Sequence, residues 1–109
     1  MTQHFRLALL GLAASAAVAA PAFGQERVRS TTRAVEPFAQ CFAAAQDRAA
    51  RPWSFVPRTS GGGTFSNAGA AGVDQPYFLD IADRGARREI LLTAASADPV
   101  VLRAVDRCV

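Results

Sequence analysis

Two apolar runs flank a short polar segment in the second half of the chain. The first run covers residues 77–82 and the second covers residues 90–92, with charged residues and Gly85 between them. Aromatic and β-branched residues on both sides of a polar, glycine-containing turn are typical of a β-hairpin. We therefore expect a hairpin over residues 75–93, with the rest of the domain covering one of its faces.

The register of this hairpin follows from its side chains, because a shift of one residue moves every side chain to the other face. A three-residue loop would pair Leu79 with Glu89 and place charge among apolar residues. A four-residue loop over residues 83–86 pairs Leu79 with Ile90 and keeps the apolar rows together. We prefer this register, although it places Asp80 opposite Glu89 as a like-charge pair. The predicted core face consists of Tyr77, Leu79, Ile81, Ile90 and Leu92.

A helix is predicted over residues 32–50, because apolar residues recur there at spacings of three and four. The apolar stripe includes Phe38, Cys41 and Phe42. The helix should end before Pro52, since a proline disfavours helical backbone at the residue that precedes it. Cys41 is therefore expected to face the core.

A second helix is predicted to start at Asp98 and Pro99. Aspartate accepts hydrogen bonds from backbone donors at a helix N-cap, and proline is well tolerated at the first helical position. Val101, Val105 and Cys108 then share one stripe, so that the second cysteine also points inward.

Between the hairpin and the first helix, residues 53–56 form an aromatic, strand-like run that Pro57 ends, which predicts an edge strand. The glycine-rich segment 58–72 follows, and residues 64–66 within it are predicted to form a short strand. The fold prediction is one small two-layer α+β domain. It has an N-terminal helix, a three- to four-stranded antiparallel meander with a central hairpin, and a C-terminal helix.

The N-terminus has the pattern of a secretory signal peptide, with Arg6 before an apolar run over residues 7–20. This run is about fourteen residues long, against the roughly twenty that a membrane-spanning helix needs. Cleavage is predicted after Gly24, with no transmembrane anchor in the product. The expected organisation is a cleaved signal peptide over 1–24, a flexible leader over 25–31 and a single domain over 32–109, in a periplasmic or secreted protein.

Charge and composition narrow the classes of partner. Removing 24 of the 109 residues leaves 85, with 11 basic and 9 acidic residues after the loss of Arg6, a net charge of +2. Nucleic-acid binding depends on dense neutralisation of phosphates, so this weak excess argues against it. All of the basic residues are arginines.

Cys41 and Cys108 are the only cysteines. Because both are expected to face inward in an oxidising compartment, they predict a disulfide between the two helices. The spacing lacks the C-x-x-C pattern of redox or metal-binding pairs. No metal and no cofactor is expected.

Few residues remain for catalysis. The only histidine, His4, leaves with the signal peptide, and lysine is absent. Paired carboxylates would permit a glycan hydrolase, and we consider this the weakest hypothesis. The carboxylates in question are Asp74, Asp80, Asp83 and Glu89. Most of them alternate with arginines, as expected of a solvated hairpin tip.

The candidate partner-binding residues are Arg84, Arg87 and Arg88 at the hairpin tip, with Arg58 and Ser60 in the glycine-rich segment. The planar guanidinium suits phosphate or carboxylate groups, and backbone N–H groups of a glycine-rich loop can face an anion. The main hypothesis is a non-catalytic binding module whose partner is a protein or an anionic envelope component. The alternative is an inhibitor of a protease or cell-wall hydrolase that acts through the loop 58–72.

Overall fold

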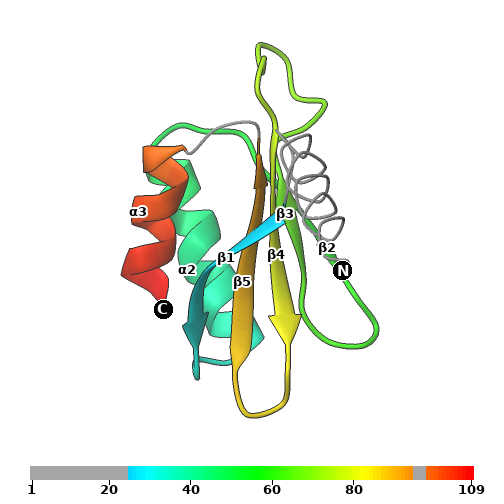
Figure 1. Cartoon of the computed structure of the whole chain (residues 1–109). Coiled ribbons are helices and arrows are strands. Elements are labelled where there is room, and N and C mark those ends of the chain that lie inside the picture. Colours follow the sequence, from blue (N-terminus) through cyan, green and yellow to red (C-terminus); the bar gives the residue numbers. More distant parts are fainter. Residues whose placement is uncertain (1–24, 95–97) are drawn as a thin grey trace, which may run out of the picture.

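The computed structural model describes residues 25–94 and 98–109, so the predicted signal peptide over 1–24 lies outside the described residues. The described residues form an antiparallel sheet of five strands and two helices (Figure 1). This confirms the α+β class. The elements in chain order are β1 (Gln25–Thr31), α2 (Val35–Arg48), β2 (Ser54–Pro57), β3 (Gly63–Ser66), β4 (Tyr77–Asp83), β5 (Arg88–Ala94) and α3 (Pro99–Cys108).

The strand order in the sheet is β1-β5-β4-β3-β2, and all neighbours are antiparallel. Strands β2 to β5 form the predicted meander, with β2 at one edge. Strand β1 forms the other edge, so the chain crosses the whole sheet through α2 between β1 and β2. The two helices lie side by side in Figure 1.

Strand β1 corrects the prediction that residues 25–31 are a flexible leader. This segment pairs with β5 along its length, so a strand precedes the first helix and the described sheet has five strands rather than three or four. The sequence lacks an apolar alternation here, because an edge strand needs few core contacts and charged residues are common on such strands. Val28, at an irregularity of the ladder, packs against the core.

The hairpin exists as predicted, but its register was wrong by two residues. Leu79 faces Leu92 rather than Ile90, and Asp80 faces Leu91 rather than Glu89. The turn covers residues 84–87, where Arg84 donates its backbone N–H to the carbonyl of Arg87 at 2.8 Å. This register removes the like-charge pair. A shift of two residues keeps every side chain on its face, which explains why the predicted core face is nonetheless buried.

The core lies between the sheet and the helices. Phe38 and Phe42 of α2 are fully buried, and the Phe42 ring lies 4.7 Å from that of Phe65 on β3. Val101 and Val105 of α3 are also fully buried. Helix α3 begins as predicted, since the side chain of Asp98 accepts the backbone N–H groups of the next turn.

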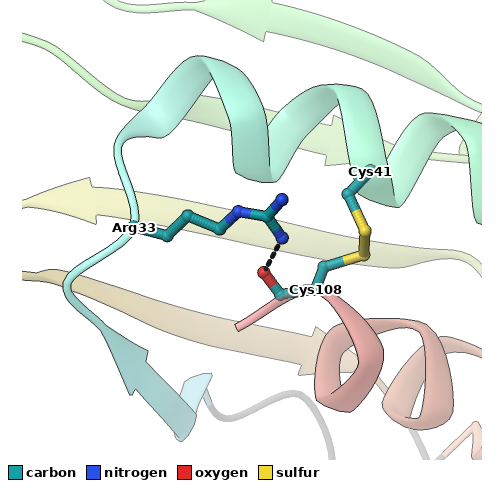
Figure 2. The surroundings of a disulfide bond; sticks show 3 residues. All are labelled: Arg33, Cys41 and Cys108. Carbon is teal, nitrogen blue, oxygen red and sulfur yellow. Dashed lines mark hydrogen bonds between the residues drawn. A yellow bond between two sulfur atoms is a disulfide. The ribbon is translucent and has the colours of Figure 1, made fainter.

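A disulfide joins Cys41 of α2 to Cys108 of α3, as predicted, with the two Cα atoms 5.7 Å apart. Beside it, Arg33 Nη1 donates to the carbonyl of Cys108 at 2.8 Å (Figure 2). This carbonyl belongs to the last turn of α3, where a helix has unsatisfied acceptors and favours a positive charge. The two helices are thus joined covalently, and at the same place the segment before α2 is joined to the end of α3 by a charge-assisted hydrogen bond.

Candidate functional site

The β2–β3 and β4–β5 turns lie at the same end of the sheet (Figure 1). We call this end, residues 58–62 and 84–88, the turn end. Successive hairpins of a meander alternate between its two ends, which is why these turns meet although about 25 residues separate them. All five candidate partner-binding residues lie at the turn end. They are Arg58, Ser60, Arg84, Arg87 and Arg88.

Arg58 connects the β2–β3 turn to β4. Its Nη1 donates to Asp80 Oδ1 at 2.6 Å and to Thr64 Oγ1 at 3.1 Å, and its Nη2 donates to the carbonyl of Ile81 at 2.9 Å. Thr64 Oγ1 also donates to Asp80 Oδ1, at 2.8 Å. The guanidinium therefore has three acceptors within the fold. Its direct contribution is to hold the turn in place.

Gly62 lets the turn approach β4 closely. Its φ is +85°, and a Cβ atom there would overlap the carbonyl of Ile81. The turn is closed by the backbone N–H of Arg58, which donates to the carbonyl of Gly62 at 3.1 Å. A Cβ at Gly61 would lie 3.1 Å from Asp83 Oδ2, so the β2–β3 turn reaches the start of the β4–β5 turn.

Ion pairs also organise the hairpin tip. Asp83 Oδ1 accepts the backbone N–H of Gly85 at 3.0 Å and Arg88 Nη1 at 3.2 Å. Arg84 Nε donates to Glu89 Oε1 at 3.1 Å. The carboxylates that were considered for acid–base chemistry on this hairpin therefore hold arginines, as a solvated tip requires. Asp74 lies in the β3–β4 loop, away from them.

Arg87, Thr59 and Ser60 have the exposed polar side chains that remain at the turn end. Within the described part of the chain, the guanidinium of Arg87 has no hydrogen bond or ion pair, whereas those of Arg58, Arg84 and Arg88 each have a carboxylate partner. The local excess of one positive charge is therefore centred on Arg87. Of the guanidiniums at the turn end, it is the one most available to a partner.

The glycine-rich segment 58–72 is not one continuous loop. Strand β3 divides it, and the part after β3 lies at the opposite end of the sheet (Figure 1). Asn67 anchors this second part, since its Oδ1 accepts the backbone N–H of Tyr77 at 2.8 Å. A partner that contacted the whole segment would have to reach both ends of the sheet.

Two aromatic residues, Trp53 and Tyr77, make structural contacts. Trp53 is 37% exposed and its Nε1 donates to Asp47 Oδ1 at 2.9 Å. Tyr77 is buried and accepts a hydrogen bond from Gln46 Nε2 at 3.3 Å. Burial raises the pKa of Tyr77 to about 12, so its hydroxyl is protonated at neutral pH.

The described residues contain neither a cluster that could bind a metal nor a helix that could span a membrane. They contain no group of three or more His, Cys, Asp or Glu side chains placed to hold a metal ion. None of their helices has both the length and the apolar character needed to cross a bilayer.

Comparison with known proteins gave no match to a family model, a curated protein or a solved structure. Function is therefore argued from the geometry of this chain.

Proposed function

We propose that the protein is an exported, non-catalytic binding module of the cell envelope that docks an acidic protein surface or another anionic envelope component through its turn end. The observation that carries this proposal is the convergence of two turns, distant in sequence, on one end of the sheet. Arg87 and Ser60 are exposed there on a framework fixed by Arg58 and Asp83.

Rigidity of this framework supports a binding role. A partner that docks on prearranged turns loses little conformational entropy on binding, which improves affinity for a given contact area. The Arg58 contacts with Asp80, Thr64 and Ile81 hold one turn against β4. Asp83 holds the other turn. Binding at Arg87 would therefore not require the backbone of the turns to become ordered.

Export and a lack of catalytic groups complete the proposal. The signal pattern over 1–24 supports export to the periplasm or outside the cell, and the disulfide between Cys41 and Cys108 suits an oxidising compartment. After cleavage the chain has neither histidine nor lysine. The most common general bases and amine nucleophiles are then missing.

Site-specific photocrosslinking in intact cells tests the docking surface. A photoreactive residue is placed at Ser60 or at Ala86, both exposed at the turn end, and at Ala68, which is exposed in the β3–β4 loop, as the matched control. We expect the same adduct from the first two positions and none from Ala68. Arg87→Glu should abolish the adduct formed from Ser60, because it reverses the uncompensated charge.

Equal adducts from Ala68, or none from the turn end, would contradict docking at this surface. The non-catalytic part of the proposal has its own test. Turnover of an envelope substrate by the purified protein, abolished by substitution of a single carboxylate such as Asp80→Asn, would refute it.

The inhibitor hypothesis has a narrower structural basis. Of the segment 58–72, the part that extends from the sheet is the β3–β4 loop, residues 67–76 (Figure 1). Ala68, Gly69, Ala71 and Gly72 are exposed there. As a second candidate function, an inhibitor would insert this loop, rather than the glycines of the β2–β3 turn, into a hydrolase cleft.

A further inference from the structure

A groove between α2 and α3 is lined by three arginines. Its volume is about 280 Å³, and its lining includes Arg48 from α2 with Arg103 and Arg107 from α3. The other lining residues are Ala45, Ala49, Val100 and Ala104. Small side chains at a helix contact leave space between the two helices, and the three arginines border that space.

These three arginines are unlike most others in the chain. Among the described side chains, all three are exposed and none makes a hydrogen bond or an ion pair within the fold. Six other arginines do make such contacts. They are Arg29, Arg33, Arg51, Arg58, Arg84 and Arg88. Of the described arginine side chains, only Arg87 shares the unpaired state of the groove arginines.

Three of the four carboxylates on and beside the two helices have other partners, and the fourth, Glu36, lies in the first turn of α2, at the opposite end of that helix from Arg48. Asp47 accepts from Trp53 Nε1, Asp98 pairs with Arg51, and Asp106 pairs with Arg29 at 2.6 Å. The groove therefore keeps its positive charge. Arg103 and Arg107 are four residues apart on α3, where like charges destabilise a helix. The helix dipole already favours Arg107 in the last turn of α3, and an anion in the groove would relieve the repulsion between the two arginines.

We propose that the α2–α3 groove binds a phosphate-bearing anion. A guanidinium donates two parallel hydrogen bonds to phosphate or carboxylate. A tetrahedral phosphate offers acceptor oxygens in several directions, which suits three guanidiniums that approach from two helices. A planar carboxylate offers them in one plane only. The groove is on the helical layer, so this proposal is independent of docking at the turn end.

The first test is a calorimetric titration of the purified protein with inorganic pyrophosphate at low salt. Arg103→Gln and Arg107→Gln should each weaken binding roughly tenfold, as expected for the loss of a charge-assisted hydrogen bond. Gln40→Glu lowers the net charge by the same amount at an exposed position of α2 outside the groove lining, and serves as the matched control. Shifts of the backbone amide resonances of Ala49 and Ala104 on titration would locate the anion in the groove.

The phosphate could belong to a free compound or to a lipid headgroup, and a second arm separates these sources. For the same variants, the fraction of protein that sediments with phosphatidylglycerol vesicles is compared with the fraction that sediments with phosphatidylcholine vesicles. Pyrophosphate binding that depends on Arg103 and Arg107 supports a free phosphate compound. If only the binding to phosphatidylglycerol vesicles depends on these residues, the ligand is a lipid headgroup.

The proposal is overturned if neither probe binds, or if binding is equally strong in the groove variants and the wild type. Misfolding would not confuse the result, because the three side chains are exposed. A thermal melt of each variant checks this point. Arg48→Gln, on the other helix, provides a second variant whose effect on binding should match that of Arg103→Gln.

Discussion

Gly62 shows how one residue sets the distance between neighbouring parts of the candidate site. The sequence indicated only that the run of glycines permits a turn or a bulge. The structure adds that the backbone at Gly62 has a positive φ and lies against the carbonyl of Ile81 on β4. The glycine is therefore required for two separate reasons, its conformation and its lack of a side chain.

Gly62→Ala should be clearly more destabilising than Gly69→Ala. Both glycines have a φ of +85°, but a Cβ at Gly69 meets no described atom within 4 Å. Gly69→Ala therefore measures the conformational cost alone, about 1–2 kcal/mol. Gly62→Ala adds steric overlap with β4 and should lower the free energy of unfolding by about a further 2 kcal/mol. Urea denaturation of both variants measures the difference, and equal effects would contradict the close approach.

Arg58 illustrates the limit of residue-level reasoning about the site. Its position in a glycine-rich segment suggested a free cation for a partner. Asp80 is 22 residues away in sequence, and only the placement of β2, β3 and β4 side by side brings the two together. The charge of Arg58 is thus satisfied by the fold, while that of Arg87 is not.

At the scale of elements, the end of α2 contains a residue in an unfavourable conformation. Ala50 has a φ of +56° and follows the C-cap Ala49. Its backbone N–H donates to the carbonyl of Asp47 at 3.0 Å, and that of Arg51 donates to the carbonyl of Gln46 at 2.9 Å. This is the Schellman arrangement, in which glycine is the preferred residue at the position of Ala50.

Ala50→Gly should stabilise the protein. Relief of the left-handed conformation outweighs the greater freedom of glycine in the unfolded chain, for a net gain of about 0.5–1 kcal/mol. Thermal and urea denaturation measure it. Ala44→Gly is the matched control, because Ala44 is exposed within α2, and it should destabilise by about 1 kcal/mol. If both substitutions destabilise alike, the assigned helix end is incorrect.

Strand β1 also belongs to the scale of elements. Its polar sequence has no preference strong enough to form a strand alone, and only Val28 among its described side chains packs on the core. The open edge of β5 supplies the hydrogen-bonding partner. An edge strand of this kind is determined by its neighbour, which explains why the sequence indicated a leader.

For the molecule as a whole, the disulfide joins the two helices across most of the described chain. The two cysteines are 67 residues apart. Cross-linking residues at such a separation restricts the unfolded chain strongly. The adjacent hydrogen bond from Arg33 to the carbonyl of Cys108 reinforces the same junction in the folded state. The relative position of α2 and α3, and with it the arginine groove, depends on this junction.

Replacing both cysteines, Cys41→Ala with Cys108→Ala, should lower the free energy of unfolding by about 4 kcal/mol on the chain-entropy model. Urea denaturation of the variant and of the wild type gives the difference. Under a strong reducing agent the two proteins should instead have similar stabilities, which serves as the control. A loss below about 1 kcal/mol under oxidising conditions would show that the bond contributes little.

The sequence by itself determined the elements whose signals are local. The apolar stripes of α2 and α3, the Asp98 N-cap, the alternation of β4 and β5 and the inward cysteines all follow from spacing and residue type. The buried face of the hairpin was predictable for the same reason. The disulfide was predictable because the chain has only two cysteines and an oxidising compartment was expected, and the inward face of both helices agrees with that pairing.

Only the tertiary structure decided the hairpin register, the pairing of β1 and whether each arginine has a partner. Register depends on which turn forms, and the contacts of Asp83 with Gly85 and Arg88 favour a turn one residue later than expected. Likewise, whether an arginine is paired depends on carboxylates far away in sequence. Long-range contacts therefore separate the satisfied guanidinium of Arg58 from the unpaired ones at the turn end and in the helical groove.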